Sequence, residues 1–214
     1  MSKLSFWYMG IFVPGIVLLP IAYAIKKYPI LDKALKVIFL YLLTAGITNV
    51  IAAVLAFNNK NNLFLLHAYS AIEFALLSIY FFLLVEKLFV KQLILSIIVL
   101  YVIYCLLNVA FVQRIDQFNT YTRSIQAIMI SGYSLYYLYT GIGNFVSNRK
   151  KGPHYWIALG LITYFMSSLV QFSFSNFFST YFTREIKFWL WNFHATMVLL
   201  MYLFFFKAYA ICKE

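Results

Sequence analysis

The chain has 214 residues, of which 64% are hydrophobic, 21% aromatic and only 11% charged, and its formal net charge is +11. A soluble domain usually has about a quarter charged residues, and a fold of this size in water could not hide so much apolar surface. The Lys and Arg residues stand in short runs between apolar stretches, which favours anionic lipid headgroups over nucleic acid as their partner.

Seven apolar runs are long enough to cross a bilayer, since a membrane helix needs about 20 mostly apolar residues. The runs are too long for barrel strands and lack alternating polarity, so they are expected to be helices. In chain order their approximate bounds are Ser5–Ile25, Lys36–Phe57, Leu63–Val85, Leu88–Val112, Thr120–Val146, His154–Phe178 and Glu185–Tyr209. The sequence therefore predicts an all-α polytopic membrane protein with a single seven-helix domain over residues 1–214.

Proline and glycine residues within the runs predict local features of the helices. Pro14 and Pro20 are expected to kink the first helix. Small residues permit close contact between helices, and the candidates are Gly132, Gly141, Gly143 and Gly160.

The Lys and Arg residues beside the runs predict the orientation, because cytoplasmic loops carry more of them. The larger set lies on one side and comprises Lys26, Lys27, Lys33, Lys36, Lys87, Lys91, Arg149, Lys150, Lys151, Lys207 and Lys213. The smaller set comprises Lys3, Lys60, Arg114, Arg123, Arg184 and Lys187. We therefore expect the N-terminus outside and the C-terminus in the cytoplasm.

Polar side chains inside the runs are costly in lipid, so each requires a partner or a function. In the predicted orientation most of them lie in the outer halves of the helices, namely Asn49, His67, Tyr69, Asn108, Ser124, Gln126, Gln171, Asn192 and His194. Side chains from six helices at one depth could line an outward-facing cavity, the usual form of a small-molecule site. The alternative is that the amides join helices through hydrogen bonds worth about 0.6–2 kcal/mol each.

The candidate ligand-binding residues are Glu73, His67, Tyr69, Asn49, Gln126, Gln171, Asn192 and His194. The tyrosines expected to lie deeper than the interfacial aromatic residues are candidate walls of the same cavity, and they are Tyr69, Tyr133 and Tyr164.

Glu73 is the sharpest candidate, because a carboxyl group in the middle of a membrane helix must be protonated or paired. Tyr69 precedes it by four residues, about 40° around the helix, and is expected to be a local neighbour. Arg123 is assigned to the outer loop side, so no Lys or Arg is expected at the depth of Glu73. His67 is about 120° away around the same helix, whereas His194 could approach across the bundle.

Other chemistry has little support in the sequence. One Glu and two His are an acceptable zinc set, but Glu73, His67 and His194 form no spaced motif, and we expect neither a metal nor a cofactor. No GxSxG nucleophile motif and no Gly-rich phosphate loop occurs.

Three segments resemble a group of small uncharacterised bacterial membrane proteins with seven helices. They are LLHAYSAIEF (Leu65–Phe74), HYWIALGLITYF (His154–Phe165) and LWNFH near the start of the last run. The resemblance implies a multi-pass protein of the bacterial inner membrane, with Glu73 and His67 at polar positions of that group. It implies no activity.

These observations leave several functions open. The first is a sensor or receptor-like binding module with an outward-facing polar pocket for a small or lipid-like ligand. The second is an intramembrane enzyme that acts on a lipid through Glu73 with His67 or His194. The third is a small transporter, and the fourth is a purely structural or assembly role. The expected partners are membrane lipids, a small-molecule or lipid ligand and a membrane protein that contacts Arg149–Lys151, with no nucleic acid.

Overall fold

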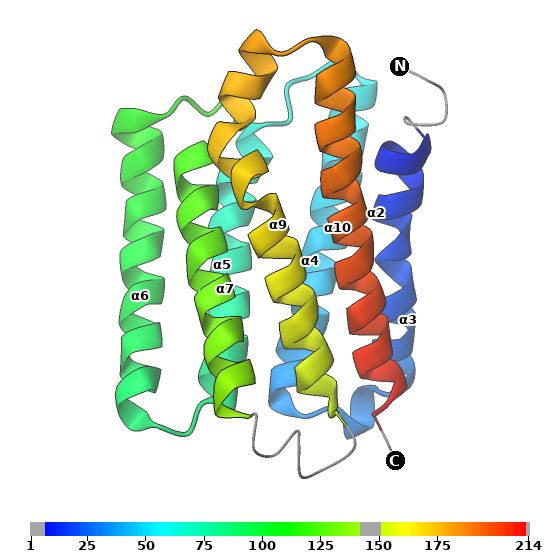
Figure 1. The fold of residues 1–214 in the computed structure, drawn as a ribbon, viewed down its shortest axis with the longest axis vertical. Helices are drawn as coiled ribbons and strands as arrows, with labels where there is room; N and C mark the ends of the chain where they lie inside the picture. Colours follow the sequence, from blue (N-terminus) through cyan, green and yellow to red (C-terminus); the bar gives the residue numbers. More distant parts are fainter. Residues whose placement is uncertain (1–6, 142–150, 213–214) are drawn as a thin grey trace.

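The computed structural model describes residues 7–141 and 151–212, which are almost entirely helical (Figure 1). The elements are η1 (Tyr8–Phe12), α2 (Val13–Ile16), α3 (Leu18–Lys26), η2 (Tyr28–Ile30), α4 (Lys33–Phe57), α5 (Phe64–Leu84), α6 (Leu88–Leu107), η3 (Asn108–Val112), α7 (Thr120–Thr140), α9 (Pro153–Tyr181) and α10 (Arg184–Ala210). Several predictions fall outside the described residues: the end of the fifth run, Gly143, Lys3, Arg149, Lys150 and Lys213.

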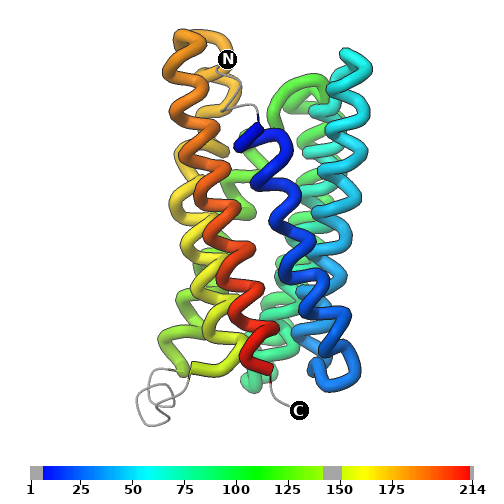
Figure 2. Tube along the Cα trace, turned by 90° about the vertical axis from the view of Figure 1, so that its right-hand side faces the viewer, coloured from blue at the N-terminus to red at the C-terminus, as the bar shows by residue number. Residues whose placement is uncertain are grey.

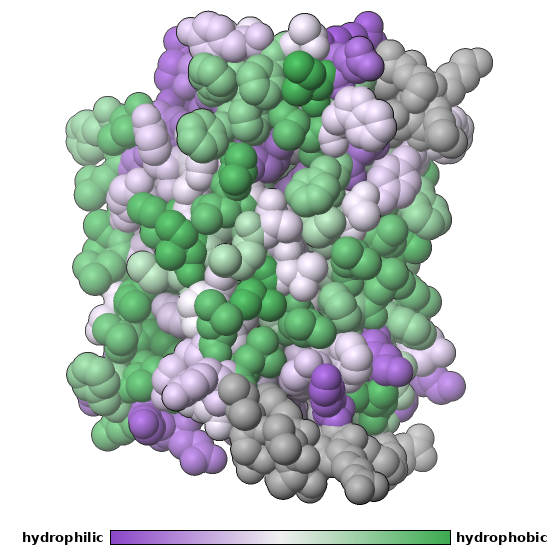
Figure 3. Space-filling view, in the orientation of Figure 1, coloured by the Kyte–Doolittle hydropathy of each residue, from purple (hydrophilic) through white to green (hydrophobic). Residues whose placement is uncertain are grey.

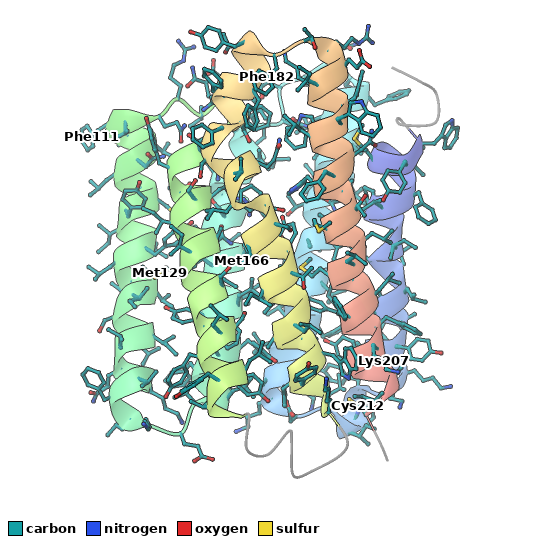
Figure 4. The ribbon with its side chains drawn as sticks, viewed as in Figure 1. Phe111, Met129, Met166, Phe182, Lys207 and Cys212 are labelled. Atoms are coloured by element: carbon teal, nitrogen blue, oxygen red, sulfur yellow. The ribbon has the colours of Figure 1, made fainter. Side chains whose placement is uncertain are left out.

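Within the described residues, six helical segments are long and apolar enough to cross a membrane. They are Tyr8–Lys26, Lys33–Phe57, Phe64–Leu84, Leu88–Val112, Pro153–Tyr181 and Arg184–Ala210. Hydrophobic side chains cover the middle of the face in Figure 3, and hydrophilic ones gather toward its two ends. Lys207 and Cys212 lie at one end of the bundle in Figure 4, and Phe182 and Phe111 lie at the other. The six helices support a multi-pass membrane protein.

The helix α7 corresponds to the fifth predicted run but is not among the six apolar segments. It has 21 residues and runs alongside the others (Figure 1). Its composition is less apolar because its buried face carries polar side chains, namely Thr120, Thr122, Arg123, Gln126, Ser131 and Ser134. These groups face neighbouring helices, so a hydropathy average underestimates how well α7 suits an apolar surrounding.

The regular hydrogen bonding of the first membrane helix is interrupted at Val17. The π-helical turn η1 leads into α2, which ends at Ile16, and α3 starts at Leu18. Pro20 has no N–H to donate to the carbonyl of Ile16, four residues earlier, and its ring crowds that carbonyl. The interruption at Val17 therefore follows from Pro20, whereas the predicted kink stays a prediction, because Val17 keeps helical dihedral angles of φ −54° and ψ −28°.

Six helices form a closed ring. Close contacts link α3 to α4, α4 to α5, α5 to α7, α7 to α9, α9 to α10, and α10 back to α3. The remaining long helix, α6, packs against α5 on the outside of this ring and lies at its edge in Figure 1. The Tyr101 hydroxyl also ties α6 to α7 by donating to the carbonyl of Thr122 at 3.1 Å.

The two ends of the ring are packed differently. We call the end where η1 and α10 begin the N-terminal end, and the end where α10 finishes the C-terminal end. The buried residues of α4 all lie between Ala34 and Ala45, and those of α10 all lie between Ala195 and Tyr209. Both ranges are in the part of the helix nearer the C-terminal end, so this half of the ring holds the filled core.

Gly160 shows how tightly the filled half is packed. A Cβ atom at Gly160 would lie 3.1 Å from Cβ of Phe204 and 3.3 Å from the backbone oxygen of Met201. The expected close contact is therefore confirmed there, between α9 and α10. It is wrong for Gly132, where a Cβ atom would have no neighbour within 4 Å, because this side of α7 faces open space.

Replacing Gly160 by Val is expected to lower the free energy of unfolding by about 1–3 kcal/mol, because the added carbons overlap a backbone atom that cannot turn away. Thermal unfolding of the purified protein in detergent measures the loss. The control is Gly132→Val, which carries the same change in helix propensity without the contact. Equal losses in both variants would contradict the close packing of α9 on α10.

A hydrogen bond joins two helix starts at the C-terminal end. The carboxylate of Asp32 accepts a hydrogen bond from the backbone N–H of Leu35 at 2.8 Å, which caps α4, and lies 2.8 Å from Nε2 of His154 on α9. Partial burial acts to raise the pKa of Asp32, but the hydrogen bonds from His154 and Leu35 outweigh it, so the pKa is lowered. The carboxylate therefore contributes to stability.

The contribution of Asp32 should be present at neutral pH and disappear in acid. A lowered pKa in the folded state stabilises the protein above the unfolded value of about 3.9, and this is lost as the pH falls through the folded value. Asp32→Asn keeps a capping side chain but loses the charge. We expect it to melt below the wild type at pH 7, by no more than about 1 kcal/mol because the site is half-exposed. A difference in melting temperature that persists unchanged to pH 3 would contradict this account.

Candidate functional site

A cavity of about 650 Å³ extends from the N-terminal end of the ring to the level of Tyr41 on α4 and Met201 on α10. On α4 its lining residues follow one face of the helix, at Tyr41, Ala45, Thr48, Asn49 and Ala52. Across from them, the first helix contributes Met9, Val13 and Pro14. The cavity borders the filled core at buried residues such as Tyr41 and Ala45 and extends to the part of α4 beyond Ala45 that has no buried residues.

Three of the other helices place polar groups in the wall of this cavity. Tyr69 and Glu73 come from α5, Arg123 from α7 and Tyr164 from α9. The last helix, α10, contributes Arg184, Lys187, Trp191 and His194. Four of the eight predicted site residues therefore line one space, namely Asn49, Tyr69, Glu73 and His194.

Glu73 is buried and accepts hydrogen bonds from three side chains. The Tyr69 hydroxyl donates to Oε1 at 3.1 Å, as their spacing on the helix predicts. Gln126 Nε2 donates to Oε2 at 2.8 Å, and Arg123 Nη1 forms an ion pair with the same oxygen. Glu73 is therefore a paired carboxylate that joins α5 to α7.

The guanidinium of Arg123 lies at the depth of Glu73, where the sequence predicted no Lys or Arg. Arg123 lies on the first turn of α7, but its side chain is buried and reaches inward along the bundle. Nη2 donates to the hydroxyl of Tyr164 at 3.1 Å, and the guanidinium lies 4.4 Å from the centre of the Phe172 ring. The assignment to the loop was wrong because a long Arg side chain can place its charge well away from its backbone.

One signal for Arg123 is visible in the sequence. Arg123, Gln126, Ile130 and Ser134 follow one another at helical spacing, and all four are buried. This is the periodicity of an inward face of a helix.

His194 lies beside the ion pair without contacting Glu73 directly. Its ring packs on Tyr164 and Phe172, with centroid separations of 5.6 Å and 5.4 Å. Its Nδ1 lies 2.9 Å from the hydroxyl of Ser168 on α9. His194 was predicted to approach Glu73 across the bundle. Both residues line the cavity, and His194 places its imidazole in the cavity wall.

His67 has a different place from the one predicted. Its Nε2 lies 3.1 Å from the carbonyl of Gln117, in the connection between η3 and α7, and His67 does not line the cavity. The same connection is held by Asn119, whose amide donates to the Leu66 carbonyl at 2.8 Å. These bonds position Phe118, which lines the cavity and packs on Trp191 at 5.6 Å. His67 therefore helps to hold the segment that places Phe118 in the cavity wall.

The remaining predicted polar residues lie between helices. Gln126 does not line the cavity, but it bonds two residues that do, Glu73 and Arg123. Gln171 is buried on α9, and its Oε1 has no hydrogen-bond partner among the described residues. On α10, the Asn192 carbonyl accepts a bond from Thr196, whose oxygen is 2.9 Å from the hydroxyl of Tyr8. Within the described chain Gln171 therefore has an unsatisfied buried oxygen, and near Asn192 it is the contact between Thr196 and Tyr8 that joins α10 to η1.

Of two other candidates, Asn108 bonds locally, at the end of α6, and Ser124 bonds a neighbouring helix. Asn108 is buried and donates to Oε1 of Gln113 at 3.4 Å, and the Ser124 hydroxyl lies 2.9 Å from that of Ser173 on α9. Tyr133, predicted as a cavity wall, is not among the lining residues, whereas Tyr69 and Tyr164 are.

The zinc set considered from the sequence does not assemble. Across residues 7–141 and 151–212, no group of three or more His, Cys, Asp or Glu side chains could hold a metal ion. His67 bonds the carbonyl of Gln117 and His194 lies beside the hydroxyl of Ser168, so the two imidazoles have separate partners.

The fold and the site define a helical multi-pass membrane protein with a polar cavity between its helices. No protein-family model, curated protein or solved structure matches the chain. The resemblance to small bacterial seven-helix proteins therefore stays a prediction, and the function must be argued from the cavity.

The ion pair between Glu73 and Arg123 should be strongly coupled. Glu73→Gln leaves a buried guanidinium without its counter-charge, and Arg123→Met leaves a buried carboxylate. Each is expected to cost about 3–5 kcal/mol of unfolding free energy. The double variant should lose clearly less than the sum of the two, because neither charge is left alone. Unfolding of the purified protein in detergent measures all three.

A control for this cycle is Arg114→Gln. It breaks the exposed pair with Asp116, where Arg114 Nη2 lies 2.7 Å from the carboxylate, and should change stability little. Additive losses for Glu73 and Arg123 would show that the pair is not a coupled unit.

Proposed function

We propose that the chain is a receptor-like binding module of the bacterial inner membrane, with seven spans, its N-terminus outside and its C-terminus in the cytoplasm. In this orientation the cavity faces outward and receives a small or lipid-like ligand. The observation that carries the proposal is the cavity itself: about 650 Å³ of space with polar groups from α4, α5, α7, α9 and α10 in its wall. Small-molecule sites commonly have this form, mostly apolar with a few convergent polar groups.

The charge distribution supports the orientation. At the C-terminal end, the described chain carries Lys26, Lys27, Lys33, Lys36, Lys87, Lys91, Lys151 and Lys207. At the N-terminal end it carries Lys60, Arg114, Arg184 and Lys187. The positive-inside rule places the first group in the cytoplasm, and the cavity is at the opposite end.

The contacts of Glu73 favour binding over catalysis. A general acid or base must exchange a proton with its substrate, whereas Glu73 already accepts bonds from Tyr69, Arg123 and Gln126. His67, the other proposed catalytic group, bonds the Gln117 carbonyl outside the cavity. A transporter is also less well supported, because buried side chains fill the C-terminal half of the ring.

A partner protein remains part of the proposal. Of the basic segment predicted to contact it, Arg149 and Lys150 lie outside the described residues. Lys151 is described, and its ammonium group donates to the Tyr155 hydroxyl at 2.9 Å.

Filling the cavity should abolish binding. Ala52 lines the cavity from α4, so Ala52→Trp is expected to remove most of the small molecule that co-purifies with the wild-type protein. Native mass spectrometry from a mild detergent, followed by extraction, measures what is bound. The matched control is Ala53→Trp, because Ala53 is exposed on the same helix and is not a lining residue.

The comparison between these two variants decides the proposal. Similar melting temperatures for both would show that the added indole does not disrupt the fold. Should Ala52→Trp unfold, Thr48→Leu at another lining position serves in its place. If wild type and variants carry the same bulk phospholipid and nothing else, the cavity is not a ligand site.

A further inference from the structure

The first helix approaches α4 closely along only part of its length. Val17 and Ile21 approach α4 at Gly46, where a Cβ atom would lie 3.8 Å from Val17 and 4.0 Å from Ile21. Nearer the N-terminal end, η1 and α2 pack on α10 instead. Figure 2 shows this blue segment leaning toward α10 and separating from the outer part of α4. From Val17 toward the N-terminal end, the first helix and α4 thus diverge.

The lining residues on both sides of this divergence are mainly apolar. Met9, Val13 and Pro14 face the cavity from one side, and Thr48 and Ala52 face it from the other. The neighbouring α4 side chains are exposed and apolar: Ile47 is 61% exposed and Val50 is 64% exposed. An acyl chain in this opening would keep an apolar surrounding on all sides, whereas a small hydrated ion would gain nothing from it.

The charges in the wall of the cavity favour an anion. Glu73 is neutralised by Arg123, which leaves Arg184 and Lys187 as the uncompensated charges of the lining. Within the described part of the chain, neither has a carboxylate within 4.0 Å. Lys187 donates to the carbonyl of Ser179, and the guanidinium of Arg184 lies 5.7 Å from the Phe188 ring. Both cations keep donors free for a ligand.

We infer that the ligand is an anionic amphipath that enters sideways from the bilayer, with its acidic head at Arg184 and Lys187 and its acyl chain between η1–α2 and α4. This inference rests on the proposed binding function and names the class of ligand for the same cavity. Arg184 and Lys187 stand on the first turn of α10, at the level of the headgroups in the proposed topology. A carboxylate and a phosphate are equally suited to these donors.

The first experiment varies the head of the ligand at constant chain length. The probes are palmitate, hexadecyl phosphate, lysophosphatidylcholine and hexadecyltrimethylammonium, added to the delipidated full-length protein in neutral detergent. Binding is measured by native mass spectrometry and by the shift in melting temperature. We expect palmitate, hexadecyl phosphate or both to bind, and the zwitterionic and cationic probes to bind at least about tenfold more weakly. The stronger of the two anions identifies the head as carboxylate or phosphate.

Charge variants separate specific recognition from general attraction to a basic surface. Arg184→Gln should weaken the anionic probe about tenfold at low salt. Lys60→Gln removes a cation at the same end of the bundle that does not line the cavity and should leave binding unchanged. Equal effects of the two variants would overturn the assignment of the head to Arg184.

The path of the chain is tested with palmitate that carries a diazirine at its chain end. Photolysis followed by peptide mapping should place adducts in residues 8–16 and 45–53, and an excess of unlabelled palmitate should abolish them. Adducts spread over the whole lipid-facing surface would overturn lateral entry.

The outcomes separate a failure of the binding function from a failure of the ligand assignment. If no probe binds and the wild type carries no small molecule that Ala52→Trp removes, the binding function itself fails. If no probe binds but Ala52→Trp still removes a co-purified molecule, the binding function stands and the assignment of an anionic amphipath fails. If zwitterionic or cationic amphipaths bind as well as anionic ones and Ala52→Trp removes them, the binding function stands and the assignment of an anionic ligand fails.

Discussion

The buried ion pair between Glu73 and Arg123 is the constraint on which the outer half of the structure depends. A charge in an apolar surrounding is tolerated only when it is paired and its hydrogen-bonding groups are satisfied. Glu73 meets this requirement with donors from its own helix and from α7, and Arg123 meets it with Glu73 and with Tyr164 on α9. Three helices must therefore keep one relative position. The cavity exists beside them because the remaining helices, α4, α10 and the first helix, are not drawn into the cluster.

The helical architecture could be predicted from the sequence because it depends on local, one-dimensional properties. Hydropathy and run length located the helices, and the break near Pro20 follows from the chemistry of a single residue. The contact between Tyr69 and Glu73 was also predictable, because both lie on one helix four residues apart. Whether α7 spans the membrane was harder to judge, since its polar side chains face inward and hydropathy records their presence but not their direction.

The composition of the site could be predicted only in part, because it depends on tertiary contacts. Asn49, Tyr69, Glu73 and His194 were expected to share a cavity and do so. His67 was expected with them, yet it supports a connecting segment through the Gln117 carbonyl. Arg123, Arg184 and Lys187 were treated as loop charges because their positions near helix ends resemble those of ordinary interfacial cations. Whether a charged side chain enters a cavity depends on its length and on the side of the helix that carries it. Sequence spacing alone does not show which side of the helix faces the cavity.

The contrast between the two halves of the ring also limits what a ligand could move. A ligand shifts a conformational equilibrium only by binding one state better than another, so the segments that change must contact it. The first helix meets this condition: its outer part lines the cavity, and it is separated at Val17 from α3, which packs on α4 and α10. At the C-terminal end, Lys27 follows α3 and donates to the carbonyls of Ala210 and Cys212, which fixes α3 to the end of α10. The helix α10 lines the cavity and also holds Lys27 at the C-terminal end, and α4 lines the cavity at Tyr41 and starts at the same end with Lys33, so these two helices connect the site to that end directly.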